Sequence, residues 1–221
     1  MPSWPVHIAL AKKLNKTLKL SDDFILGNII PDVPNGYIIA NTKCKENKRF
    51  THFNINKENT KPIISIENFL KKYQNKLNNP IILGYYTHLL TDKYFNDDFH
   101  KNHVKNKDTI LRDGNINNTP FKGWELKQKD FSTFGDHLTL NGNLKNTISQ
   151  TKDTKKLIKD LPFTFPDEDI NLTINKINSL ITNIPKKQTD YLVYTEEELI
   201  NTFNNCYKHI LKNIKNQKIE K

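Results

Sequence analysis

The sequence is poor in the residues that would cross-link a small fold or anchor it in a membrane. It has two cysteines among 221 residues, Cys44 and Cys206, and two cysteines so far apart are more often free thiols than a disulfide. No segment approaches the roughly 20 apolar residues of a membrane span, and the first residues lack the apolar stretch of a secretory signal. We therefore expect a cytoplasmic protein with no transmembrane segment and two free thiols.

Arginine is also scarce, and this limits what the positive charge indicates. The formal net charge is +10, with 34 basic residues, but Arg49 and Arg112 are the only arginines. Such a charge favours anionic partners such as nucleic acid, phosphorylated metabolites or a membrane surface. Arginine, however, is the preferred fork for phosphate and base edges, and a composition rich in Lys, Asn and Ile also follows from an AT-rich genome. Nucleic acid therefore stays an alternative partner.

The spacing of apolar residues predicts an all-α fold. The predicted helices cover 5–18, 22–27, 63–77, 81–95, 144–161, 168–184 and 195–214. Ser21 is a candidate cap for the second of them, and Thr195 with Glu198 forms a capping-box pattern at the start of the last. We expect a single-domain helical bundle over residues 1–214, followed by a frayed tail over residues 215–221.

Two segments show no helical spacing. Residues 33–49 contain Pro34 and Gly36 and are predicted to form a long loop that delivers His52, and long ordered loops are usually functional. Residues 96–146 are polar and contain several glycines, so their structure is left open, with a flap over the site as one interpretation. We find no internal repeat, no domain linker and no alternation typical of strands beyond a few residues.

The most informative local motif is GYYTHLLTDKYF, at residues 84–95. It places His88 and Asp92 four residues apart, on one face of a helix and one turn from each other. A carboxylate in so apolar a helix needs a metal ion, a cationic partner or several hydrogen bonds. The motif therefore indicates either a metal site or a His/Asp pair satisfied inside the core.

Three more residues extend this set of metal ligands. His7, Asp32 and His52 are each flanked by apolar residues, as buried ligands would be. With His88 and Asp92 they make five ligands that suit zinc or a mixed pair of divalent ions. A carboxylate can bridge two metal ions, and such pairs commonly hold a phosphoryl group and activate water. The candidate bridge is Asp92, because it lies on the same helix face as His88.

Four segments in this order resemble the zinc-dependent phospholipase C family, particularly its short, leaderless bacterial members. They are PSWPVHIALA, FILGNIIPDVPNG, RFTHF and LGYYTHLLTDKYF, which lie within residues 2–95. Each motif alone is weak, but the ordered set is specific. The resemblance implies an all-α bundle of the phospholipase C type, shared with the single-strand-specific zinc nucleases, and hydrolysis of a phosphodiester.

The resemblance also implies how the ligands are shared. Asp32, His52, His88 and Asp92 would surround one metal ion, His7 and Asp92 would hold a second, and Asp32 would be the catalytic base that orients the attacking water. Secreted members complete the second site with the amine of an N-terminal tryptophan. Here Trp4 follows three other residues, so it cannot be assumed to play that part.

The family's third metal site is not matched. It needs a histidine four residues before a glutamate, and none of His100, His103 and His137 has a glutamate at that position. We therefore expect one to two zinc ions, or other divalent transition metals, and keep these three histidines as further candidate ligands beside the simpler interpretation of solvated loop residues. His209, on the lysine-rich last helix, is expected to be exposed.

Other residues are candidates for the substrate. Arg49, three residues before His52, is the candidate substrate-binding residue, because its guanidinium could fork onto a phosphate; an ordinary salt bridge is the alternative. Tyr85 and Tyr86 are expected to pack in the core.

Together these patterns predict a metal-dependent, phospholipase C-like hydrolase. It would cleave a small phosphodiester or a phospholipid head group with metal-activated water. One alternative is a nuclease or nucleotide phosphodiesterase on the same scaffold, which would need exposed aromatic residues such as Trp124 and Phe121 for base stacking. The other is a non-catalytic helical module stabilised by metal. Structural zinc is usually closed by four protein ligands, so coordination separates this module from an enzyme. The oligomeric state does not follow from the sequence.

Overall fold

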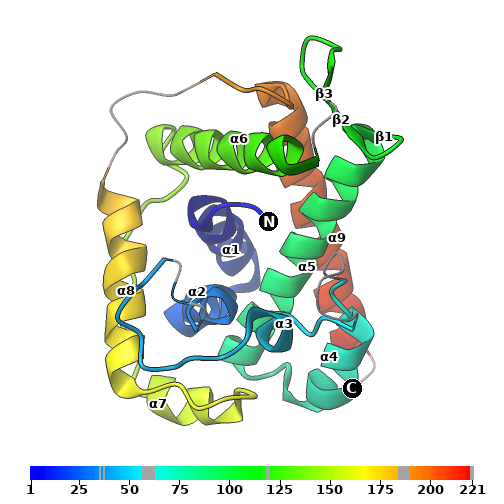
Figure 1. Cartoon of the computed structure of the whole chain (residues 1–221). Helices are drawn as coiled ribbons and strands as arrows, with labels where there is room; N and C mark the ends of the chain where they lie inside the picture. Colours follow the sequence, from blue (N-terminus) through cyan, green and yellow to red (C-terminus); the bar gives the residue numbers. More distant parts are fainter. Residues whose placement is uncertain (35, 37, 56–62, 118–119, 184–189, 220–221) are drawn as a thin grey trace. The chain divides into compact units, whose positions relative to one another are not determined.

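A computed structural model of the chain describes residues 1–34, 36, 38–55, 63–117, 120–183 and 190–219. These residues are mostly helical and include one small sheet, which confirms the predicted α-helical class (Figure 1). The α-helices are α1 (Trp4–Leu18), α2 (Asp22–Ile29), α3 (Lys48–Thr51), α4 (Ile66–Tyr73), α5 (Pro80–Asn102), α6 (Pro120–Leu140), α7 (Thr154–Leu157), α8 (Asp167–Thr182) and α9 (Glu196–Ile219). The short 3₁₀ helices are η1 (Ile30–Asp32), η2 (Gln74–Lys76) and η3 (Ile158–Asp160). The strands are β1 (Val104–Lys105), β2 (Asp108–Ile110) and β3 (Ile116–Asn117).

The chain forms two compact units that interleave along the sequence. Unit 1 consists of Met1–Leu10, Thr91–Lys145 and Asn183–Lys221, and unit 2 of Ala11–Leu90 and Asn146–Thr182. Helices α1 and α5 each begin in one unit and end in the other. The expectation of a single domain over residues 1–214 stays a prediction.

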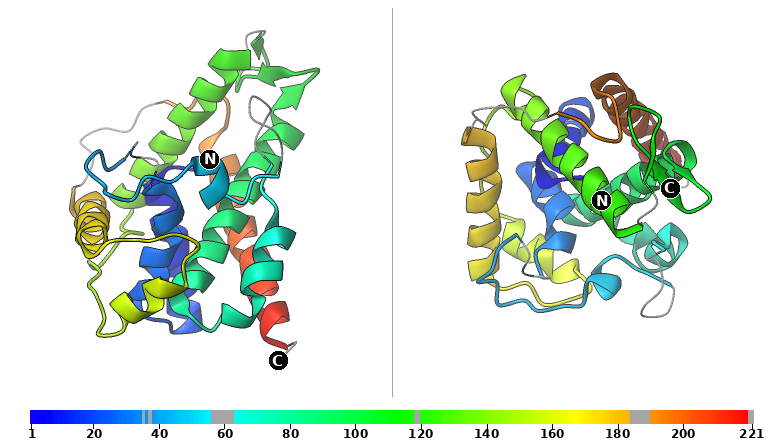
Figure 2. Two further views of the ribbon diagram at one scale, coloured as in Figure 1. Left: turned by 60° about the horizontal axis from the view of Figure 1, so that its bottom comes forward. Right: turned by 45° about the horizontal axis from the view of Figure 1, so that its top comes forward.

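Within unit 2, α2 and the first half of α5 cross at two glycines. A β-carbon added to Gly27 would lie 2.2 Å from the carbonyl oxygen of Ile81, and one added to Gly84 would lie 2.2 Å from that of Phe24. The two backbones therefore touch, which only residues without a side chain permit. Helix α8 packs against α2 in the same unit (Figure 2).

Helix α5 is the most buried helix segment, as its apolar sequence predicts. Every residue from Ile81 to Asp92 is buried. The sequence-based end at residue 95 is too early, since α5 continues to Asn102. The reason is that Phe95 and Phe99, four residues apart, extend the buried stripe by another turn.

Within unit 1, α6 packs on the antiparallel sheet, whose strand order is β1-β2-β3 (Figure 1). Gly123 makes this approach close, because a β-carbon there would lie 2.0 Å from Thr109 Oγ1. Further along α6, buried Asp130 accepts three backbone N–H bonds, from Leu192 at 2.8 Å, Val193 at 2.7 Å and Tyr194 at 2.9 Å. This carboxylate fixes the chain that leads into α9.

The predicted helix over residues 144–161 is wrong for most of its length. Only α7 and η3 are helical there. Side chains from neighbouring helices bind the backbone before them: the N–H of Ile148 donates to Asn178 Oδ1 at 2.8 Å, and that of Ser149 to Asp22 Oδ2 at 3.1 Å. These amides therefore do not form helical hydrogen bonds.

Two further helix boundaries differ from the prediction. The helix expected at residue 63 begins at Ile66, because Ser65 Oγ caps it by accepting from the N–H of Asn68 at 3.1 Å. Ser21 lies at the N-cap of α2 as predicted, but its hydroxyl donates to Asp23 Oδ2 at 3.2 Å and does not cap the backbone. Helix α2 also passes through Gly27, the predicted end, since that glycine serves the crossing with α5.

At the C-terminal end the structure confirms the predicted cap. Thr195 N donates to Glu198 Oε2 at 2.7 Å and Glu198 N to Thr195 Oγ1 at 3.1 Å, which confirms the capping box. The last helix runs to Ile219, so residues 215–219 continue α9, and their fraying stays a prediction. Residues 220–221, like residue 184 of the predicted helix 168–184, lie outside the described residues. None of the described helices is long and apolar enough to cross a membrane.

Candidate metal centre

Three predicted ligands converge inside unit 2. Asp32 ends η1, His52 follows α3, and His88 lies in the middle of α5. One donor atom from each lies within 4.8 Å of the other two, and all three residues are buried. His52 Nε2 lies 3.3 Å from Asp32 Oδ1 and 3.2 Å from His88 Nε2. This Asp32 cluster brings a carboxylate and two imidazoles to one point.

Backbone carbonyls orient both imidazoles of the Asp32 cluster. His88 Nδ1 lies 2.7 Å from the carbonyl oxygen of Asn28, which the glycine crossing of α2 and α5 brings to that position. His52 Nδ1 lies 3.0 Å from the carbonyl oxygen of Lys48, and Tyr85 donates its hydroxyl to the Thr51 carbonyl in the same turn. A carbonyl oxygen only accepts, so these contacts favour a proton on both Nδ1 atoms; Thr51 Oγ1 also lies 3.0 Å from His52 Nδ1.

The tautomers have a consequence for the two Nε2 atoms. With Nδ1 protonated, a neutral imidazole presents a lone pair at Nε2, and the Nε2 atoms of His52 and His88 face each other at 3.2 Å. Two lone pairs at this distance repel unless a cation, either a proton or a metal ion, lies with them. Neutral imidazole with its second nitrogen bound to a carbonyl is the usual form of a histidine ligand to zinc. The donor set therefore fits zinc.

Asp32 is held as a carboxylate by its neighbours. Burial by itself would raise the pKa of Asp32, but the Lys48 ammonium, the hydrogen bond from His52 and the charges of the two imidazoles hold it well below its usual range. Lys48 Nζ lies 3.2 Å from Asp32 Oδ1. The cluster therefore offers an anionic oxygen as a ligand.

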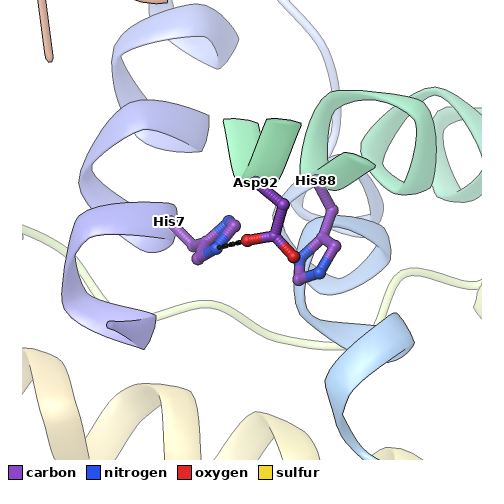
Figure 3. Close-up of side chains that lie close together, drawn as sticks. All are labelled: His7, His88 and Asp92. Carbon is purple, nitrogen blue, oxygen red and sulfur yellow. Dashed lines mark hydrogen bonds and ion pairs between the residues drawn. The ribbon is translucent and has the colours of Figure 1, made fainter. Parts of the chain in front are cut away.

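The other two predicted ligands pair within unit 1. His7 Nε2 lies 3.2 Å from Asp92 Oδ1, and both side chains are fully buried (Figure 3). Asp92 follows His88 by one turn of α5, on the same helix face (Figure 3). A single helix thus carries one member of the His7–Asp92 pair and one member of the Asp32 cluster.

The three histidines kept as further ligands lie elsewhere. Among the described residues, His100, His103 and His137 belong neither to the Asp32 cluster nor to the group around the His7–Asp92 pair. The His103 ring packs 4.0 Å from that of Tyr194, and His137 Nδ1 lies 3.2 Å from Glu196 Oε2. As metal ligands these histidines stay predictions without geometric support.

Several single-residue expectations are confirmed. Tyr85 and Tyr86 are fully buried core residues, and Cys44 and Cys206 are buried free thiols. His209 is exposed. These residues therefore belong to the core or the surface and not to the site.

Aromatic and basic candidates for the substrate have mixed outcomes. Trp124 is 59% exposed on α6, whereas the side chain of Phe121 lies outside the described residues. Trp4 begins α1 and is buried. Arg49 is half-buried on α3, next to Lys48, and its role toward phosphate stays a prediction.

Two residues that position the site were missed from the sequence. Lys48 lies one helical turn before His52, and Asn28 lies four residues before Asp32. The first spacing was a usable signal, because residues four apart on a helix are neighbours. The role of Asn28 rests on its backbone carbonyl, which no side-chain pattern reveals.

Comparisons with protein-family models, curated proteins and solved structures gave no match for this chain.

Proposed function

We propose that this protein is a metal-dependent phosphodiester hydrolase of the phospholipase C type, with zinc as its metal. The supporting observation is the Asp32 cluster, in which a carboxylate and two imidazoles with fixed tautomers meet at one buried point. The order of the four sequence motifs, which is independent of the structure, also supports a phospholipase C-like hydrolase. Without a metal ion, a proton would have to separate the two Nε2 atoms, which lie 3.2 Å apart.

Helix α5 suggests how two metal ions would be arranged. Asp32, His52 and His88 would hold the first ion, and His7 with Asp92 the second. Because His88 and Asp92 are one turn apart on one continuous helix, Asp92 would be the candidate to share its carboxylate between the two ions. Asp92 is accordingly the proposed bridge.

The chain's own residues would divide the chemistry between them. A bound zinc pair supplies Lewis acidity, which makes water a better nucleophile near neutral pH and stabilises charge on the phosphoryl oxygens. Asp32 would orient the attacking water and accept its proton. The carbonyls of Asn28 and Lys48 hold the imidazoles in register. The proposed substrate is a small phosphodiester or a phospholipid head group.

A nuclease on the same scaffold is the second candidate. The observation in its favour is Trp124, which exposes 59% of its surface on a chain of net charge +10. Exposed aromatic residues and lysines are what single-stranded nucleic acid binds.

Metal analysis of the purified protein, followed by a substrate panel, tests both candidates. We expect about one to two zinc ions per chain and zinc-dependent cleavage of a chromogenic phosphodiester. Cleavage of phosphocholine or phosphoethanolamine esters would support the first candidate, and cleavage of single-stranded oligonucleotides that depends on Trp124 the second. A preparation that holds no metal, and takes up none from zinc or manganese, would contradict the proposal.

A further inference from the structure

A lysine forms an ion pair with the carboxylate of the Asp32 cluster. Lys48 Nζ lies 3.2 Å from Asp32 Oδ1, and His52 Nε2 lies 3.3 Å from the same oxygen. The Lys48 side chain is 36% exposed, whereas that of Asp32 is 6% exposed. Lys48 therefore links a buried ligand oxygen to the solvent.

The backbone of Lys48 is fixed although its side chain reaches solvent. Its carbonyl oxygen accepts from His52 Nδ1 at 3.0 Å and from Thr51 Oγ1 at 3.2 Å, within the short helix α3. The four-carbon stem can thus change rotamer without moving away from the cluster. A lysine on such a stem keeps its ammonium within a few ångströms of the same point.

An ammonium and a metal ion would compete for Asp32. Both neutralise the same carboxylate, and two cations a few ångströms apart repel each other. A metal ion bound by Asp32, His52 and His88 would therefore weaken the bond between Lys48 and Asp32. The released ammonium would then lie beside the metal with three unused donors, and lysine is a common point-charge ligand of phosphate.

We propose that Lys48 is the residue that binds the phosphoryl group of the substrate, and that it becomes available when a metal ion displaces its ammonium from Asp32. This inference rests on the proposed metal centre. The Lys48 charge would weaken metal binding and strengthen phosphate binding. Its removal should therefore change the two affinities in opposite directions, which the loss of a residue with only a structural role would not do.

The variant Lys48→Met removes the charge and keeps most of the apolar stem. Its zinc affinity, measured by competition with a chromophoric chelator, should rise roughly tenfold. Its affinity for inorganic phosphate, measured by calorimetry on the zinc-saturated protein, should fall roughly tenfold, as expected for the loss of a charge-assisted hydrogen bond. Lys48→Arg should keep most of the phosphate affinity, and Lys48→Gln repeats the test if the methionine variant does not fold.

Lys71→Met is the matched control. Lys71 also pairs with a carboxylate in unit 2, Glu67 at 2.7 Å, but on the exposed face of α4. It should change neither affinity. If wild type binds zinc but phosphate binds Lys48→Met and Lys48→Gln as tightly as wild type, the role of Lys48 is overturned and the metal centre stands. Weaker zinc binding in Lys48→Met would also overturn it. A wild-type protein that binds no zinc overturns both proposals.

Discussion

The metal proposal depends on the orientation of two imidazole rings, those of His52 and His88. The carbonyls of Lys48 and Asn28 place protons on the Nδ1 atoms of His52 and His88, so that both Nε2 atoms face the cluster. A hydrogen bond from the far nitrogen of a ligand histidine to a carbonyl oxygen fixes the tautomer and raises the basicity of the ligand. A zinc ion would take the place of the proton that otherwise separates these atoms, and this makes the response of the protein to zinc a direct test.

His52→Gln tests this arrangement through stability. In wild type, zinc at about 100 times its dissociation constant should stabilise the fold by about 2.7 kcal/mol, which raises the Tm by about 5 to 10 °C for a chain of this length. His52→Gln should abolish this rise. Without zinc its Tm should be lower than that of wild type, because the variant loses the bonds of His52 to Lys48 and Asp32, each worth about 1 kcal/mol.

His209→Gln is the control for this measurement, since His209 is exposed on α9. Thermal melts with and without zinc should show the full wild-type rise in this control. A full rise in His52→Gln as well would show that the Asp32 cluster does not bind the ion.

At the scale of elements, the glycine crossing of α2 and α5 carries the site. Gly84 has the carbonyl of Phe24 and the N–H of Asn28 within 2.7 Å of the position of an added β-carbon. The same close approach puts the Asn28 carbonyl 2.7 Å from His88 Nδ1. The packing of α2 on α5 and the orientation of His88 therefore both depend on the absence of a side chain at Gly84.

Gly84→Ala should separate α2 from α5. Overpacking of this kind costs about 1 to 3 kcal/mol, and the Asn28 carbonyl would move away from His88. We expect lower stability in urea titrations together with weaker zinc binding. Gly123→Ala, where the added β-carbon meets Thr109 in unit 1, is the matched control. It should lower stability without changing zinc affinity at the Asp32 cluster; equal loss of zinc affinity in both variants would contradict the argument.

His103, which directly follows α5, makes the stability of the fold depend on pH. Burial against Tyr194 lowers the pKa of His103, although the charges of Glu198, Asp98 and Asp130 act to raise it. Below the unfolded-state pKa of about 6.5, the unfolded chain therefore binds a proton that the folded protein does not. Stability should fall as the pH drops from that value, and the fall should end once the folded pKa is passed.

His103→Phe should remove this contribution and keep the packing on Tyr194. The free energy of unfolding, measured in urea between about pH 8 and about pH 5, should decline less steeply in the variant than in wild type. Identical pH profiles would show that His103 titrates alike in both states.

For the molecule as a whole, the sequence predicts the helical class better than the helix boundaries, and the metal ligands stay a prediction. His88 and Asp92 could be identified because a spacing of four is decisive on a helix. Helix α6 was missed because Gly123 and Gly135 look like helix breakers. They are packing positions instead: an added β-carbon would lie 2.0 Å from Thr109 Oγ1 and 2.6 Å from Ser3 Oγ, respectively. Contacts between distant segments decide such cases, and a local pattern does not contain them.

As the proposed bridging ligand, Asp92 would serve residues from both units of the chain. Asp92 belongs to unit 1 and His88 to unit 2, although a single helix carries both. If Asp92 bridges two ions, Asp92→Asn removes the charge that the second ion requires. We expect the variant to lose at least one zinc ion and all phosphodiesterase activity, and to keep its helicity.

Hydrogen exchange shows where the ion is lost. In wild type, zinc should slow amide exchange both around His52 and around His7; in Asp92→Asn the effect should be confined to the segment around His52, because the Asp32 cluster keeps its own ligands. Asp97→Asn, an exposed position on α5 that pairs with Lys93, serves as the control and should match wild type in metal content and exchange. An Asp92→Asn protein with the wild-type zinc count would show that Asp92 and His7 form a core pair and that the second ion does not exist.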